Sequence, residues 1–209
     1  MSGVRSHRIC PPDLSAWKSM NLDDRMFPIA IRPLADRPDV VGLLAEWFYT
    51  EWNTFDSRSR REIEAQLRGN LSRDALPITF VALRGADVIG TVSLDASDLP
   101  AYDHLPPWLA CLYVVPSQRS AGVGQLLVHH AVAFAREREV SSLFLWSPGS
   151  TRLYEKCGWR IFRTDVYGGR PITLMELAFQ RGQEHEGYGY DGFDKTEGVR
   201  RDICDATIK

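Results

Sequence analysis

The sequence lacks several features that would each assign it to a large class of proteins. No apolar stretch approaches the roughly 20 residues that a membrane-spanning helix needs. Lysine and arginine (25) nearly balance aspartate and glutamate (27), so the formal net charge is only -2. A protein without a strongly basic surface is poorly suited to bind nucleic acid. We therefore expect neither a membrane nor a nucleic acid as its partner.

Cysteine is scarce as well, and its spacing excludes two kinds of cross-link. The four cysteines, at positions 10, 111, 157 and 204, lie far apart and form no C-x-x-C pair. This spacing favours neither a disulfide framework nor a metal site. Residues 1–24 are interrupted by arginine and proline and lack the apolar run of a secretory signal. The sequence thus predicts a cytoplasmic protein that binds no metal.

The 209 residues are 44% hydrophobic, which suits one compact domain with appendages. We expect the domain at residues 25–180 and an N-terminal extension at 1–24. Residues 181–209 mix glycine, aromatic and acidic residues without periodicity, which is typical of a C-terminal tail or lid.

The hydrophobic pattern within this domain predicts alternating strands and helices. The run at 108–115 is almost continuously apolar, as in a strand buried on both faces. Residues 84–87 have the composition of a hairpin turn. Strands are expected at 27–34, 78–83, 88–94, 108–115, 142–146, 159–167 and 172–179, and helices after Asp36 and at 56–68, 123–138 and 150–157.

A glycine-rich turn between the strand at 108–115 and the helix at 123–138 contains Gly122 and Gly124. Such a turn presents backbone amides at the positive end of the helix dipole and can bind an anion. Taken alone, it is equally consistent with a tight strand-to-helix connection. A dinucleotide-binding G-x-G-x-x-G motif would need a third glycine at Leu127, and a Walker loop would need Gly-Lys-Ser/Thr.

Two segments together resemble one enzyme family. Arg119-x-x-Gly122-x-Gly124 resembles the Q/R-x-x-G-x-G/A signature of the GNAT superfamily of N-acetyltransferases. About 30 residues later, Tyr154-Glu155-Lys156-Cys157-Gly158-Trp159 is similar to that family's Y-E-K-x-G-F/W segment. The resemblance implies an α/β (α+β) fold with a mixed, mostly antiparallel central sheet of six to seven strands flanked by about four helices.

The resemblance also implies acetyl-coenzyme A as the cofactor and assigns roles around it. Tyr154 would act as the general acid that protonates the departing thiolate, and the Val114 N–H would polarise the thioester carbonyl. Ser147 stands where many members have asparagine. The expected cofactor-binding residues are Leu112, Tyr113, Val114, Arg119, Ser120, Ala121, Gly122, Val123, Gly124, Gln125, Ser147 and Tyr154.

The acceptor amine must lose a proton before it attacks, so a carboxylate or an ordered water is needed as general base. Glu51 and Asp95 are candidates, and the sequence does not decide between them. Trp47, Trp52, Trp108 and Trp146 could line an acceptor cleft or belong to the core. The expected substrate-binding residues are Glu46, Trp47, Glu51, Asp95, Asp98, Asp103 and Trp108.

The acidic and aromatic residues near the expected acceptor entrance favour a small cationic amine, with aminoglycoside modification and hence antibiotic resistance as the most specific form. Acetylation of a protein N-terminus or lysine is the main alternative, because fold does not determine acceptor. A non-catalytic acyl-CoA sensor is a second alternative. Pairing into a homodimer through the last strands or the tail is left open.

Overall fold

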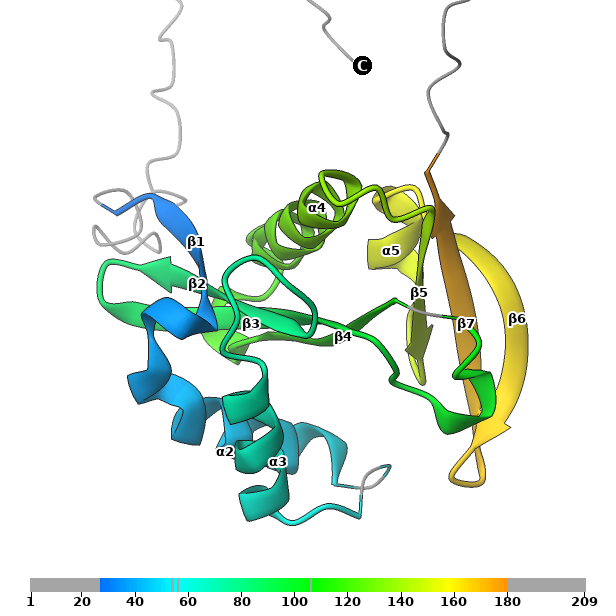
Figure 1. Ribbon diagram of the computed structural model, residues 1–209, viewed down its shortest axis with the longest axis horizontal. Coiled ribbons are helices and arrows are strands. Elements are labelled where there is room, and N and C mark those ends of the chain that lie inside the picture. The colour runs from blue at the N-terminus through cyan, green and yellow to red at the C-terminus, as the bar shows by residue number, and fades with distance from the viewer. Residues whose placement is uncertain (1–26, 54, 56, 106, 180–209) are drawn as a thin grey trace, which may run out of the picture.

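A computed structural model describes residues 27–53, 55, 57–105 and 107–179. These residues form one twisted sheet with helices on both of its faces (Figure 1). The expected N-terminal extension at 1–24 and the C-terminal tail or lid at 181–209 lie outside the described residues, so the proposed domain limits stay a prediction.

The sheet has seven strands in the order β1-β2-β3-β4-β5-β7-β6. Neighbouring strands are antiparallel throughout, with the exception of β4 and β5. This confirms the predicted mixed, mostly antiparallel sheet. The strands are β1 (Ile29–Pro33), β2 (Ile78–Arg84), β3 (Asp87–Asp95), β4 (Trp108–Val114), β5 (Ser142–Ser147), β6 (Arg160–Tyr167) and β7 (Arg170–Ala178).

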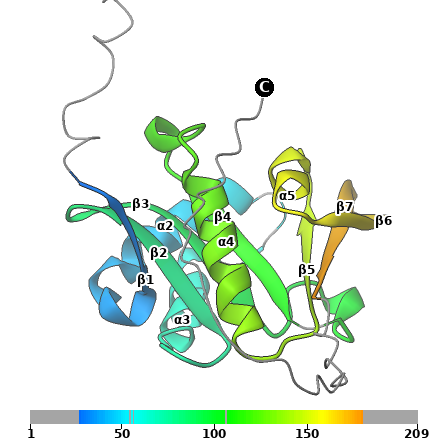
Figure 2. The ribbon, with the colours of Figure 1, turned by 90° about the horizontal axis from the view of Figure 1, so that it is seen from above.

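Four α-helices accompany the sheet, as expected from the family resemblance. They are α2 (Val41–Trp52), α3 (Arg60–Gly69), α4 (Val123–Arg136) and α5 (Arg152–Lys156). Helices α2 and α3 cover one face of the sheet and α4 covers the other, as both views show (Figures 1 and 2). None of the helices in the described residues is long and apolar enough to cross a bilayer.

Strands β4 and β5 are parallel and pair at a single position, Trp108 with Phe144. Beyond this point the two strands separate. The prediction that residues 108–115 are buried on both faces is therefore wrong for the second half of the strand: Trp108 to Ala110 are buried, whereas Cys111 to Val114 are only half-buried. A strand that loses its neighbour on one side also loses the cover that side chains on that neighbour provide.

Helix α4 packs on the sheet through the face that the sequence predicted, with one correction. Val123, Leu127 and Ala131 are buried in the main core with residues of β2, β3 and β5. Leu126, expected on the same face, is 47% exposed. It lies at the edge of the apolar stripe, because three residues advance the helix by less than one turn.

The charged helix α3 begins later than predicted, at Arg60 rather than near position 56. Its start is fixed by a capping box in which the Ser59 hydroxyl and the Glu62 carboxylate satisfy each other's backbone amides. Ile63 and Leu67 are buried against α2 and β2, and most of the other residues face solvent. This orientation confirms the predicted solvent-facing helix with two apolar anchors.

Candidate active site

The glycine-rich turn leads directly into α4 and uses its two glycines differently. Gly122 is the N-cap residue, with φ 82°, and a Cβ there would meet nothing within 4 Å. Its conformation is left-handed, which favours glycine. At Gly124 a Cβ would lie 3.3 Å from Leu153 Cδ2 of α5. Gly122 therefore leaves open space in front of the helix, whereas Gly124 allows α4 and α5 to approach each other.

The first turn of α4 offers amides without intrahelical partners. The first hydrogen bond of the helix runs from the Leu126 N–H to the Gly122 carbonyl, at 3.1 Å. The amides of residues 123 to 125 precede it, and no side chain caps this end. Ser120 also has a positive φ of 65°. The arrangement presents several donors and the positive end of a helix dipole to an anion.

Arg119, expected beside the cofactor, bridges the turn to helix α2. Its Nε donates a hydrogen bond to the Val114 carbonyl at 2.9 Å, and its Nη2 lies 3.6 Å from Glu51 Oε2. The guanidinium also lies 5.6 Å from the centre of the Tyr113 ring. A predicted cofactor contact and a predicted base are thus an ion pair. Both side chains are about half exposed, so the pair contributes only about 0–1 kcal/mol.

Strand β4 carries an irregularity beside the place where it leaves β5. Its register against β3 shifts between Tyr113, which faces Thr91, and Ala110, which faces Ser93. Cys111 has a positive φ of 52° in this bulge. Bulges of this kind bend a strand and re-aim its side chains and backbone groups.

The backbone groups of Val114 face away from β3. The next amide along the strand, that of Val115, donates to the Ile89 carbonyl at 3.1 Å. Because hydrogen-bonded and non-hydrogen-bonded pairs alternate, Val114 and its partner Gly90 form a non-hydrogen-bonded pair. The Val114 N–H is therefore directed to the side on which β5 diverges, as its expected role requires.

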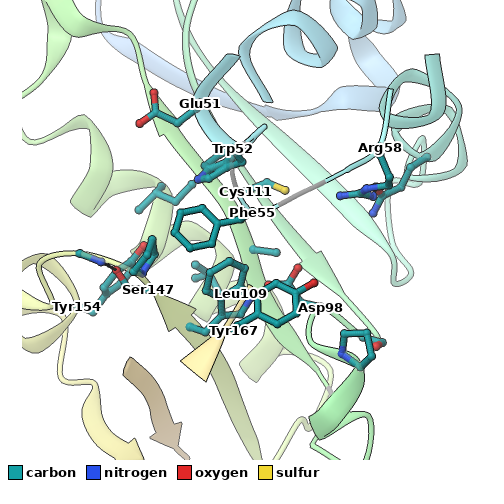
Figure 3. A pocket seen from close by; sticks show the side chains of 18 residues that line it. Glu51, Trp52, Phe55, Arg58, Asp98, Leu109, Cys111, Ser147, Tyr154 and Tyr167 are labelled. Carbon is teal, nitrogen blue, oxygen red and sulfur yellow. Dashed lines mark hydrogen bonds between the residues drawn. The ribbon is translucent and has the colours of Figure 1, made fainter. Parts of the chain in front are cut away.

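A pocket of about 560 Å³ lies where the two strands separate (Figure 3). This volume falls within the range typical of small-molecule sites. Five residues predicted for the site line it, from five different elements or loops: Glu51, Asp98, Leu112, Ser147 and Tyr154. The tryptophans Trp52 and Trp146, weighed as cleft or core residues, line it too.

Tyr154 lies on the short helix α5 and lines the pocket next to Ser147 (Figure 3). Its ring packs edge-on against Trp159, with 6.3 Å between the ring centres. Burial raises the pKa of the phenol to about 12, with smaller contributions from Cys157 and Asp98. At neutral pH the phenol therefore keeps its proton and can donate it.

Asp95, the other candidate base, does not line the pocket. It is 6% exposed and accepts a hydrogen bond from Asn70 Nδ2 at 3.0 Å. Asn70 also reaches Thr79 Oγ1 at 3.4 Å, which in turn lies 2.8 Å from Ser93 Oγ. Burial raises the pKa of the Asp95 carboxyl to about 6, opposed by Asn70 and by the charge of Arg58. Asp95 thus belongs to a buried polar network that joins α3 to β2 and β3.

Four residues expected to bind substrate also lie outside the pocket lining. Trp108 is fully buried in a cluster with Phe144 and Leu174, so its prediction as an acceptor contact is wrong. Trp47 packs on Tyr113, with ring centres 5.0 Å apart. Glu46 pairs with Arg60 at 3.2 Å, and Asp103 accepts a hydrogen bond from Ser97 Oγ. These side chains serve packing and surface ion pairs.

Sequence reasoning missed several pocket residues, foremost Phe55, Arg58, Cys111 and Tyr167. No local pattern marks them, because Phe55 and Arg58 lie in the segment between two helices and Tyr167 lies at the end of an edge strand. Within the described residues, no group of three or more histidine, cysteine or acidic side chains could hold a metal ion.

Known proteins resemble this chain both in sequence and in fold. Residues 38–159, more than half of the chain, match the model of the acetyltransferase (GNAT) family. No curated protein matches the chain.

Among solved structures, an acetyltransferase of the GNAT family from Streptococcus pneumoniae is 22% identical with a TM-score of 0.56, over 73% of this chain and 100% of that one. Aminoglycoside 6'-acetyltransferase type Ii is 16% identical with a TM-score of 0.57, over 73% and 99%. Arabidopsis thaliana NAA60, in complex with acetyl-CoA, is 16% identical with a TM-score of 0.55, over 72% and 98%. At these identities the likeness establishes a shared fold.

Proposed function

Since the chain belongs to the acetyltransferase (GNAT) family, we propose that it transfers the acetyl group of acetyl-coenzyme A to a primary amine of a small molecule bound in the pocket beside Tyr154. The observation that carries this proposal is the position of Tyr154. A phenol that stays protonated lines the same pocket as two carboxylates, at the edge of the sheet from which the Val114 N–H points outwards.

The residues at the start of α4 fit the pyrophosphate of the cofactor. The open space in front of Gly122 and the amides of Val123, Gly124 and Gln125 would hold it, with Ser120, Ala121 and the charge of Arg119 at its edge. When bound, acetyl-coenzyme A supplies a reactive thioester. The bulged part of β4, from Leu112 to Val114, would run along the pantetheine arm in the manner of an added strand.

Three groups then divide the proton chemistry. The Val114 N–H stabilises negative charge that develops on the carbonyl oxygen, and Tyr154 gives its proton to the departing sulfur. Glu51 is the better placed of the two proposed bases, because it lines the pocket whereas Asp95 is enclosed in its own network. A water between the Glu51 carboxylate and the amine would extend its reach.

The enclosed form of the pocket favours a small-molecule acceptor. Glu51 and Asp98 attract an ammonium group, and Trp52, Phe55 and Tyr167 offer aromatic faces to it. A polycationic acceptor of the aminoglycoside type, with antibiotic resistance as its consequence, is the sharpest form of this proposal. A protein N-terminus or lysine is the alternative, since an acidic pocket also receives a basic peptide.

Calorimetry with acetyl-coenzyme A tests the first step, and release of free coenzyme A in the presence of aminoglycosides, polyamines and peptides tests the second. Acetylation of at least one small amine, with the product identified by mass, is the expected result. Activity on peptides alone would reject the small-molecule acceptor, and absence of cofactor binding would reject the whole proposal. A sensor would bind the cofactor and acetylate nothing.

A further inference from the structure

The end of the pocket remote from Tyr154 carries positive charge. Arg58 lines the pocket, and Figure 3 shows its guanidinium on the opposite side of the pocket from Tyr154 and Ser147. Arg58 Nη1 donates a hydrogen bond to Gln66 Oε1, and Gln66 lines the pocket as well. A second lining residue therefore helps to orient this guanidinium.

A second guanidinium borders the same region. Arg170, the first residue of β7, lies over the ring of Phe55 with 4.9 Å between the guanidinium carbon and the ring centre. Phe55 lines the pocket, and so does Tyr167, the residue paired with Arg170 across the β6–β7 turn. The two arginines come from opposite parts of the chain, which makes the positive character of this region independent of any single loop.

The carboxylates do not remove this asymmetry. Glu51 already lies 3.6 Å from Arg119, on the far side of the pocket from Arg58 (Figure 3). Asp95 interacts electrostatically with Arg58 but is enclosed and bonded to Asn70, so it does not line the pocket. The pocket thus has a carboxylate and a phenol towards one side, aromatic side chains between, and a guanidinium towards the other.

Resting on the proposed acetyl transfer, we propose that Arg58 is a specificity-determining residue that selects acceptors with an anionic group, such as a carboxylate, at the end remote from the reacting amine. A guanidinium binds a carboxylate through two parallel hydrogen bonds. Trp52, Phe55 and Tyr167 suit an aromatic or apolar body between the two ends. A polycation would place an ammonium group against Arg58, which disfavours it.

Three probes of one shape test this selectivity: 4-(aminomethyl)benzoic acid, its primary amide and 1,4-bis(aminomethyl)benzene. Calorimetry measures their binding to the full-length protein, with and without coenzyme A. We expect the acid to bind about tenfold more tightly than the amide, and the diamine to bind most weakly. Equal affinities, or no binding of the acid, overturn the inference.

Variants at Arg58 assign the selectivity to this side chain. Arg58→Gln should abolish the preference for the acid, and Arg58→Lys should keep part of it because the charge remains. Arg61→Gln is the matched control, since this arginine lies on α3, is exposed and does not line the pocket. A preference for the acid that survives in Arg58→Gln contradicts the assignment.

Acetylation of the same three amines is measured separately, as release of free coenzyme A. Turnover of all three without preference leaves the proposed acetyltransferase in place and overturns only the role of Arg58. Selective binding of the acid without any acetylation supports Arg58 and rejects the proposed reaction. The two failures are therefore distinct results.

Discussion

The cofactor side and the acceptor side of the pocket are built from different parts of the polypeptide. The cofactor side consists mainly of backbone amides from one continuous segment, residues 119–125, together with the edge of β4. The acceptor side consists of side chains from α2, the segment before α3, the loop after β3 and the end of β6. A backbone site depends on a few conformations, whereas a side-chain site changes with each residue that faces it. The first is recognisable from a short motif and the second is not.

The largest expected effect concerns Tyr154, where the two sides meet. Tyr154→Phe removes the proton donor but keeps the ring that packs against Trp159. We expect kcat to fall by about 10²-fold or more, with little change in cofactor affinity. Steady-state kinetics and calorimetry measure the two quantities. Undiminished kcat would show that Tyr154 is only a packing residue of the pocket wall.

Asp95 tests where the acceptor side ends. Its pKa of about 6 in the folded protein lies above its ordinary value of 3.8, so the folded state binds the extra proton between these two values. Stability is therefore highest below about pH 4 and is lost as the pH rises through 6. Asp95→Asn keeps an oxygen for Asn70 and carries no charge. It should raise the free energy of unfolding at pH 7 by about 1–3 kcal/mol.

Denaturant titrations at pH 4 and pH 7 measure this change, and the variant should show a weaker pH dependence than the parent. Acetyl transfer by Asp95→Asn should remain close to that of the parent, because Asp95 does not line the pocket. A loss of activity without a loss of stability would restore Asp95 as the base and extend the acceptor side into the buried network.

Gly122 tests the backbone nature of the cofactor side. Alanine there would meet no atom within 4 Å, but it must adopt a φ of 82°. A left-handed non-glycine residue costs about 1–2 kcal/mol, so acetyl-coenzyme A affinity should fall about tenfold as the turn relaxes. Gly69→Ala, at the end of α3 and equally free of close contacts, is the control. Calorimetry that finds equal affinity for parent and Gly122→Ala would argue against this turn as the binding site.

The smallest expected effect concerns the stability contributed by the ion pair that links the two sides. Arg119 and Glu51 are both about half exposed, so Glu51→Gln should change the free energy of unfolding by less than about 1 kcal/mol. The same variant should lower kcat/KM by at least tenfold if Glu51 takes the proton from the amine. A pH–rate profile that loses its acidic limb in the variant would identify Glu51 as the base. An unchanged profile would leave that role to water.

The predicted elements agree with the fold because each has a strong local signal. The hairpin turn at 84–87, the helix that follows Gly122 and the short helix closed by Gly158, with its φ of 86°, depend on neighbouring residues. The errors lie where distant strands decide the outcome. Trp108 was expected in the acceptor cleft, yet its position opposite Phe144, at the one point where β4 and β5 pair, buries it completely.

By itself, the sequence determined the family, the order of strands and helices, and the cofactor turn, because glycine spacing and hydrophobic periodicity act over short stretches of chain. Only the tertiary structure decided which carboxylates reach the pocket. The separation of β4 from β5 opens it, and the packing of α2 and α3 on the same sheet brings Glu51 and Arg58 to its walls while enclosing Asp95. Contacts between residues far apart in the chain leave no signature in a single sequence.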